Sequence, residues 1–552
     1  MVKIKKAPKV DLLELDYQLA ELPSSQHRAG LAGLVLMVDW LKRQGVSKGI
    51  CEITRLDERG ATLRINQEGL AALFDEVYAA SKEEVEEAKL RKAKGSDEFK
   101  PPLREIVKQV AKRGKTESKV YYAYPAYVPK GAFLVDLDPT ANGDKGDWIK
   151  LWRDVIWRIF RGVPATRKPF EDRAEGKQTK DSAEAWSDLS QASDYSVELP
   201  STYYIGAQAV NAENVPFKDH ARFQFLLHFW PYSIQIYVPS VVNNEGERNF
   251  VGYALAIPDI ADLELFCEEF PEVLRGRGVE SSGYRPRESV VDLAIESGLD
   301  MLKRLRERLA LRAGAKATGD LVFGVDVVHV DKQGNNIRTL GVGRIDPEVT
   351  MIDDYARIKA SFWNPLFRKQ RLSNLVNRRT WQAGFDNILC GLPYEHSIGN
   401  KTFRHDARES FRQEVQLIEE EARGNMSNDV TPEAVTASPN ATSLSCEALV
   451  YRVVGSYLQK KLKSKYQLEW SAVKEHSAKS AEYQEMKEKV ARDAFLAVRS
   501  RNGVDFADYF ASTLCSVSQP LSEQQYIRLA QALYDDTDKV RTLTMLALSA
   551  RG

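Results

Sequence analysis

One short amide-rich segment holds the side chains best suited to contacting nucleic-acid bases. Residues 203–217 follow a proline and precede an apolar run, so we expect a loop or a strand edge there. Gln208, Asn211 and Asn214 carry side-chain amides, which both donate and accept hydrogen bonds and therefore match the edges of base pairs. Lys218 follows at once, where it could meet a phosphate. The alternative is amide-rich turn chemistry, the commoner role of an isolated Asn.

Three clusters of basic residues are the second candidate for nucleic-acid contact. Phosphate backbones favour such clusters because each contact releases condensed counterions. Each cluster has an alternative interpretation as a solvated helix face, but three of them in a chain with balanced charge favour binding. The members are Lys108, Lys112, Arg113, Lys115 and Lys119; Lys303, Arg304, Arg306, Arg308 and Arg312; and Arg368, Lys369, Arg371, Arg378 and Arg379. We expect backbone contacts from the whole first cluster and from Arg378 and Arg379.

The enzyme signatures in the chain are incomplete. A Walker A loop ending in residues 113–116 would need a glycine where Gln109 stands, because that glycine lets backbone amides wrap the phosphates. His405 and Asp406 form the dipeptide used by two-metal phosphohydrolases, but no histidine pair with metal-ligand spacing accompanies them. We therefore predict a chain with no catalytic residues, no cofactor and no metal. A metal-dependent nuclease that uses His405 and Asp406 is the alternative.

Composition limits the classes of protein to which the chain could belong. Its 552 residues exceed one ordinary core, so two or more domains are expected. Lys and Arg total 78, as do Asp and Glu, whereas a protein that coats duplex DNA unaided usually has a basic excess. The five cysteines lie far apart, which fits a reducing cytoplasm. The longest apolar stretch, 31–41, is too short to span a bilayer. We expect a cytoplasmic protein.

Sequence periodicity predicts the elements that must position these residues. Helical spacing predicts a helix that Ser24 or Ser25 caps and Gly45 ends. Alternation predicts a hairpin over 51–65, and a charged pattern predicts a long helix over 67–94. The first basic cluster would lie partly on one helix face. The remaining expected elements are helices over 148–160 and 302–312, strands over 223–230, 234–238 and 250–257, and a hairpin of 321–330 with 337–345.

These elements predict an α+β fold. An N-terminal mixed α/β body with antiparallel hairpins, residues 1–425, is interrupted by a polar surface insertion over 163–199. A linker rich in Ser, Thr, Asn and Pro covers 426–443. From 444 to 552 the pattern is helical throughout, which predicts a C-terminal all-α helical bundle.

Four stretches of sequence carry a resemblance to a known family. They are Leu22-Pro-Ser-Ser-Gln-His-Arg-Ala-Gly-Leu-Ala-Gly33, Gly206-Ala-Gln-Ala-Val-Asn-Ala-Glu-Asn-Val-Pro-Phe217, and Leu227-His-Phe-Trp-Pro231 with Gly252-Tyr-Ala-Leu-Ala-Ile-Pro258. They resemble the large subunit of type I CRISPR Cascade surveillance complexes, nearest to the Myxan-type branch of type I-B-like systems. The resemblance runs through roughly residues 20–425.

The resemblance implies a non-catalytic subunit at the 5′ end of a guide RNA. Such a subunit recognises the protospacer-adjacent motif (PAM) in double-stranded DNA and promotes strand opening and R-loop formation, while base pairing reads the rest of the target. Its partners are the guide RNA, target DNA, Cascade backbone and guide-end subunits, small subunits, and an effector. The effector is a helicase–nuclease, or transposition machinery in transposon-associated variants. A protein-only scaffold is the remaining alternative.

The family adds one expectation about Met426. In related systems small subunits arise by translation that starts inside the large-subunit gene, and residues 426–552 are long enough to fold by themselves. Residues 419–424 can be encoded by purine-rich codons that suit a ribosome-binding site. An ordinary linker methionine is the alternative. Motif-reading residues differ between branches, so the roles of Gln208, Asn211 and Asn214 remain an inference from their chemistry.

Overall fold

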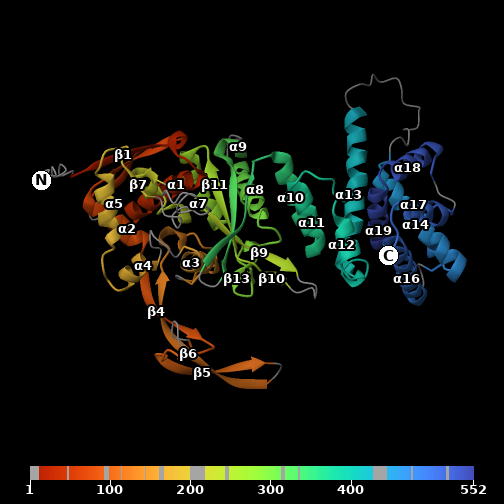
Figure 1. Ribbon diagram of the computed structural model, residues 1–552, viewed down its shortest axis with the longest axis horizontal. Helices are drawn as coiled ribbons and strands as arrows, with labels where there is room; N and C mark the ends of the chain where they lie inside the picture. The colour runs from red at the N-terminus through yellow and green to blue at the C-terminus, as the bar shows by residue number, and fades with distance from the viewer. Residues whose placement is uncertain are drawn as a thin grey trace, which may run out of the picture. The chain divides into compact units, whose positions relative to one another are not determined.

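The computed structural model divides into two compact units. The first comprises residues 1–240 and 250–352, and the second comprises 241–249 and 353–552. The structure describes residues 11–45, 49–91, 98–112, 115–142, 145–160, 167–198, 218–242, 248–312, 317–333, 336–426, 444–473, 477–517 and 521–552. Figure 1 shows mixed sheets and helices over the first unit and helices over the second, which confirms the predicted α+β class.

The predicted N-terminal helix is confirmed as α1, Ser25–Gln44. Ser24 is the N-cap, and its hydroxyl accepts the backbone N–H of His27. Gly45 takes the left-handed conformation, with φ of 66°, and ends the helix. Fourteen of the helix's twenty residues are buried, so α1 is a central element of the first unit.

Two glycines of the N-terminal motif let α1 pack closely against residues 226–229, an aromatic-rich stretch about 200 positions later in the chain. A Cβ on Gly30 would overlap the carbonyl oxygen of Leu226, and one on Gly33 would overlap that of Phe229. The contact between Gly33 and Phe229 joins two of the four stretches that carry the family resemblance. The 22–33 motif is therefore explained by packing as well as by capping.

The predicted N-terminal hairpin is confirmed, but the helix expected after it is too long. Strands β2 (Cys51–Asp57) and β3 (Gly60–Ile65) pair, and β1 (Leu13–Gln18) completes a sheet in the order β1-β3-β2. Helix α2 spans only Gln67–Val77. Strand β4, Ala80–Glu87, follows it, so the prediction of a helix over 67–94 is wrong beyond α2.

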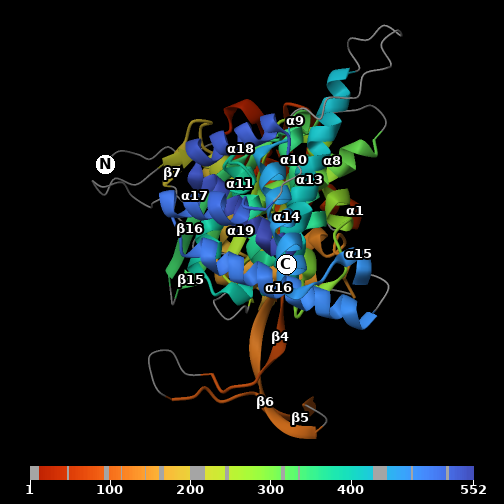
Figure 2. The same cartoon turned by 90° about the vertical axis from the view of Figure 1, so that its right-hand side faces the viewer.

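The strands β4, β5 (Arg104–Lys112) and β6 (Lys115–Pro129) form an arm with the order β4-β6-β5. Residues 80–87 pair in antiparallel register with 122–129, and this non-local pairing replaces the helix that the charged sequence favours. Figure 2 shows β5 and β6 extending away from the helices of the first unit. The described members of the first basic cluster, Lys108, Lys112, Lys115 and Lys119, therefore lie on strands, and the predicted helix face is wrong for them.

The main sheet of the first unit has the strand order β10-β9-β11-β15-β16. Its strands are β9 (Gln235–Val242), β10 (Arg248–Phe250), β11 (Tyr253–Ile260), β15 (Val322–Gln333) and β16 (Asn336–Ile345), and β14 (Val290–Val291) pairs with β9. The β15–β16 hairpin confirms the prediction over 321–345. Helices α7 (Leu263–Arg275) and α8 (Glu296–Ala310) pack against each other and near this sheet.

The strand expected over 223–230 is wrong. Helix α6 spans Ala221–Leu226, and a 3-10 turn follows at Trp230–Tyr232. Phe223 and Phe225 are buried here, so a short apolar run has formed a buried helix, an ambiguity that periodicity alone cannot resolve.

The predicted polar insertion also contains regular structure. It includes α4 (Arg167–Ala174) and α5 (Lys180–Leu189), with β7 (Ser196–Glu198) near its end. Helix α3, Asp147–Arg158, confirms the aromatic helix expected just before it. The remaining short elements of this unit are β8 (Lys218–His220), β12 (Ser281–Ser282), β13 (Arg285–Pro286) and α9 (Thr318–Leu321).

The second unit is helical, as predicted for the C-terminus. Its helices are α10 (Val349–Ser361, which begins in the first unit), α11 (Pro365–Val376), α12 (Phe385–Gly391), α13 (Lys401–Met426), α14 (Cys446–Tyr466), α15 (Trp470–Val473), α16 (Ser477–Arg499), α17 (Gly503–Tyr509), α18 (Glu523–Asp535) and α19 (Thr537–Arg551). α19 is buried from Val540 to Ala550, and helices α13, α14, α16, α17 and α18 pack around it. The sequence predicts that residues 353–425 belong to the N-terminal body. In the structure these residues belong to the same compact unit as the C-terminal helices.

Candidate nucleic-acid interface

The strands that flank the amide-rich segment pair with each other. β7 and β8 are antiparallel and form a two-stranded hairpin, with Glu198 opposite Lys218. Gln208, Asn211 and Asn214 lie outside the described residues, and their base-reading role stays a prediction. Lys218 is described and exposed, at the start of β8.

A buried row of hydrogen-bonded side chains connects this hairpin to the N-terminus of α1. The Nε2 atom of His27 lies 3.0 Å from Oδ2 of Asp219, and its Nδ1 lies 2.7 Å from Oγ of Ser24. His27 is only 2% exposed. The residue after Lys218 is therefore held by a helix that is itself buried. Sequence reasoning missed this pair because the two partners are 192 positions apart.

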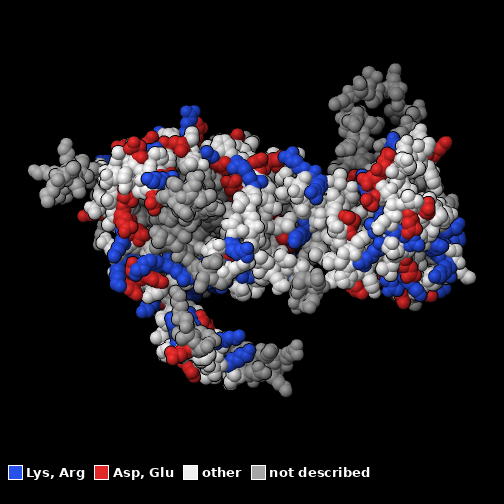
Figure 3. Space-filling model, in the orientation of Figure 1, with Lys and Arg blue, Asp and Glu red and all other residues white. Residues whose placement is uncertain are grey.

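The arm carries the first basic cluster on paired strands. Lys108 on β5 lies directly opposite Lys119 on β6, and both are exposed. Like charges in opposite positions repel each other, and a bound phosphate would relieve that repulsion. Lys108 also pairs with Glu86 and lies 5.7 Å from the ring centre of Tyr121. Figure 3 shows blue basic groups on the described part of the arm.

The rest of this cluster can be placed only by its backbone. Lys112 and Lys115 pair where β5 meets β6, but their side chains lie outside the described residues. Arg113 lies wholly outside them. The predicted phosphate contacts of these three residues stay predictions.

The second basic cluster is neutralised by acidic neighbours. Arg308 and Arg312 both bind Glu269 of α7, and Arg304 binds Asp300 one turn away. Arg308 and Arg312 hold the end of α8 to α7 through Glu269, and these three ion pairs use the charge that a phosphate would need. The arginines therefore have a packing role, which differs from the solvated helix face that was the alternative interpretation of this cluster.

Arg378 and Arg379 of the third cluster follow α11 and are exposed. Arg378 has φ of 51°, within a tight turn that directs the chain away from the helix. Arg371 of the same cluster is instead enclosed by aromatic rings, 5.1 Å from the centre of Phe362 and 5.3 Å from that of Trp381. The cluster thus divides into exposed and enclosed members.

The His405-Asp406 dipeptide has a structural environment. Asp406 is fully buried and accepts the backbone N–H groups of Trp363, at 2.9 Å, and Asn364, at 2.7 Å. The ring of His405 stacks on Trp363, with 4.5 Å between centres, and its Nδ1 lies 3.1 Å from Asp406. Burial raises the pKa of the Asp406 carboxyl above its usual value. The hydrogen bonds from Asn364, His405 and Trp363 lower this pKa, but by less than burial raises it. Across the described ranges, no three His, Cys, Asp or Glu side chains are grouped to hold a metal ion.

The part of the chain that the structure describes contains no helix long and apolar enough to cross a membrane. Two family models match the sequence. The type I-B CRISPR Cas8b N-terminal domain matches residues 50–315, and the type I-B CRISPR Cas8b C-terminal domain matches residues 322–551. None of the curated proteins matches the chain.

Proposed function

The chain belongs to the type I-B CRISPR Cas8b family, the large subunit of Cascade, and we propose that it recognises the PAM in double-stranded DNA with the segment that precedes β8. In this proposal Gln208, Asn211 and Asn214 contact base edges, and Lys218 contacts a phosphate. The observation that carries it is the anchored hairpin, in which Asp219 binds the buried His27 and so fixes one end of the amide-rich segment.

Recognition of the motif would lead to strand opening and R-loop formation with the guide RNA. Pairing with the guide approximately balances the energy of the DNA duplex that it replaces, so backbone contacts decide the outcome. Lys108 and Lys119 on the arm, and Arg378 and Arg379 after α11, are exposed and suited to such contacts. The partners in this proposal are guide RNA, target DNA, the Cascade backbone, guide-end and small subunits, and an effector, either the helicase–nuclease or transposition machinery.

A motif-library binding assay with the assembled complex tests the proposal. Replacing a base-reading amide among residues 208, 211 and 214 with Ala should cost about 1–3 kcal/mol and relax motif preference. Lys218→Ala should weaken binding to all motifs alike. Gln44→Ala, an exposed amide at the end of α1, is the matched control and should change neither quantity. Parental motif preference in all three amide variants would contradict the assignment.

We also propose that the subunit has no catalytic activity of its own. Both partners of the His405-Asp406 dipeptide have packing roles: one ring stacks on Trp363, and the buried carboxylate binds two backbone N–H groups. The nuclease alternative predicts metal-stimulated DNA hydrolysis that His405→Ala abolishes. Hydrolysis with that dependence would overturn the proposal.

An internal start at Met426 remains a further proposal for the source of the small subunit. Helix α13, which ends at Met426, packs on α19, where Arg408 donates a hydrogen bond to the carbonyl of Ala550. A product beginning at Met426 would lack this cover, so it should be stable mainly within the complex. Expression of the intact gene should give a shorter co-purifying product that a non-initiating codon at 426 abolishes. A single full-length product in a fully assembled complex would contradict it.

A further inference from the structure

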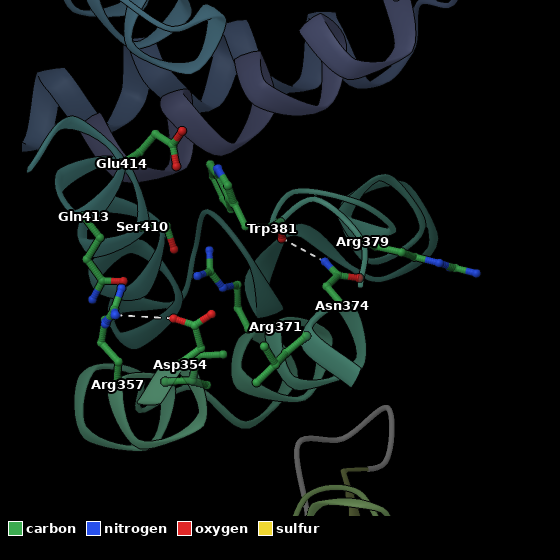
Figure 4. Close-up of a pocket in the computed structure, with 11 residues that line it drawn as sticks. Asp354, Arg357, Arg371, Asn374, Arg379, Trp381, Ser410, Gln413 and Glu414 are labelled. Atoms are coloured by element: carbon green, nitrogen blue, oxygen red, sulfur yellow. Dashed lines mark hydrogen bonds and ion pairs between the residues drawn. The ribbon is translucent and has the colours of Figure 1, made fainter. Parts of the chain in front are cut away.

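A cleft in the second unit has a distinctive chemical lining. Helices α10, α11 and α13 and the turn after α11 enclose a volume of about 210 Å³. Figure 4 shows the guanidinium of Arg371 pointing into this space, between Asp354, Ser410 and Trp381. All of the lining residues belong to residues 353–552, so the cleft lies within one compact unit.

Arg371 is a cation without a matched anion. Among the described residues, none gives its guanidinium a hydrogen bond or an ion pair, and its contacts are the rings of Phe362 and Trp381. The residue keeps some exposure to the cleft, but surrounding protein desolvates the charged group almost completely and lowers its pKa to about 10. It therefore stays protonated at neutral pH, with donors available on the side of the cleft.

Trp381 adds a second donor without a partner. Its indole Nε1 is buried and has no hydrogen-bond acceptor among the residues that the structure describes. The residue is held firmly, because Asn374 donates to its carbonyl oxygen at 2.8 Å and Phe411 packs edge-on against its ring at 5.4 Å. A buried N–H without an acceptor costs about 1–3 kcal/mol, so a rigid donor of this kind points to an acceptor outside the described part of the chain, such as a bound ligand.

The charges around the cleft favour a ligand with a single negative charge. Asp354 is paired with Arg357 at 3.3 Å, and Glu414 lies on the opposite wall from Asp354. Arg379 lines the rim of the cleft, but Figure 4 shows its side chain directed away from the space around Arg371. Because Arg357 and Asp354 are paired with each other, the charge that a single phosphodiester group would neutralise is that of Arg371.

The surrounding sequence extends the positive charge beyond the cleft. Residues 356–379 contain seven basic side chains and no acidic one, in a chain with equal totals of the two. A phosphate presents oxygen acceptors in several directions, which suits donors that come from different walls, and guanidinium groups bind it through two N–H groups at once. A lone carboxylate partner would not account for this wider basic stretch.

We propose that the cleft binds one phosphate group of a nucleic-acid strand, with Arg371 and Trp381 as its donors and Arg379 near the adjoining phosphate. The strand as the source of the phosphate rests on the proposed nucleic-acid function, whereas the phosphate chemistry rests on the cleft itself. A free phosphate or mononucleotide has the same chemistry and is the other source to be distinguished.

Fluorine NMR of the full-length protein labelled with 5-fluorotryptophan tests the site directly. The Trp381 resonance, assigned with Trp381→Phe, should shift saturably with inorganic phosphate and with a short single-stranded oligonucleotide at constant ionic strength. Arg371→Gln should abolish both shifts. Arg412→Gln removes an exposed arginine of α13 and is the matched control, which should leave both shifts intact.

The possible results separate the sources. A shift with both probes, in competition, supports a strand phosphate, whereas a shift with inorganic phosphate alone assigns the site to free phosphate. An equal or stronger response to acetate, or no response to any probe, would overturn the proposal. If Arg371→Gln does not fold, Trp381→Phe keeps an aromatic ring at this position and removes the indole N–H. That variant should weaken oligonucleotide binding several-fold, and parental affinity in it would contradict the assignment.

A parallel measurement separates this site from PAM reading. In the assembled complex, Arg371→Gln should lower the slope of log affinity against log salt by about one and keep the motif preference. If Arg371→Gln leaves the salt slope unchanged in a complex that still recognises the motif, the phosphate site in the cleft is refuted and the proposed PAM recognition is not affected. Loss of motif preference in the amide variants would leave the cleft result unaffected.

Discussion

Replacing Asp406 tests whether the His405-Asp406 dipeptide is structural. Its carboxylate is fully buried and accepts two backbone N–H groups from the residues that precede α11. A hydrogen bond to a charged group contributes about 1.5–3 kcal/mol, so Asp406→Ala should lower the free energy of unfolding by about 3–6 kcal/mol. Both N–H groups bind the same oxygen, Oδ2, so Asp406→Asn can keep both bonds but loses the charge that makes each about twice as strong, and it should lose about half as much.

Chemical denaturation measures the loss, and hydrogen exchange locates it. The amides of Trp363 and Asn364 should exchange much faster in Asp406→Ala, because both have lost their acceptor. The control is Asp505→Ala, an acid of the same unit with 73% side-chain exposure, which should change stability by less than about 0.5 kcal/mol. Parental stability and exchange in Asp406→Ala would refute the structural role. If Asp406→Ala is as stable as the parent but loses a metal-stimulated DNA hydrolysis that the parent shows, the nuclease alternative would be supported.

Three other predictions concern packing, protonation and the arm. Gly30→Ala should destabilise the chain by about 1–3 kcal/mol in thermal unfolding, because the new Cβ overlaps the carbonyl of Leu226; parental stability would show that α1 can shift. Burial lowers the pKa of His228 from 6.5 to about 3, so the unfolded chain takes up the proton first as pH falls. Stability should then fall by up to about 1.4 kcal/mol per pH unit below 6.5, and His228→Phe should remove that part of the slope; an unchanged slope would refute it. Replacing Lys108 and Lys119 with Ala should lower the salt slope of DNA affinity by about two, and an unchanged slope would mean that both are merely solvated.

Local signals were sufficient for much of the fold. The Ser24 cap and Gly45 end of α1 were predictable because both act within one turn of chain. The β15–β16 hairpin and the helical C-terminus followed from periodicity. Strand β4 was not predictable in this way, because its sequence favours a helix and only pairing with β6, some forty residues later, makes it a strand.

The candidate site was less accessible to sequence reasoning for the same physical reason. The basic residues of α8 have no obvious partners in the sequence, yet the acidic partner of Arg308 is Glu269 on α7, 39 positions away. Conversely, Arg371 belongs to an ordinary basic run, and only the fold encloses it beside Trp381. Charge clusters can be found from sequence, but which members keep an unmatched charge depends on the tertiary neighbours.

The pairing of β7 with β8 has a consequence for how the family can diversify. Both ends of the segment between residues 198 and 218 are fixed by one hairpin, and the Asp219–His27 contact secures it to α1. Closing a longer segment between fixed ends costs only about 0.6 kcal/mol for each doubling of its length. Substitution, insertion or exchange of this stretch should therefore leave the scaffold intact. If the proposed PAM recognition by this segment is correct, motif preference could diverge between lineages, or be transferred by grafting, through exchange of this segment alone.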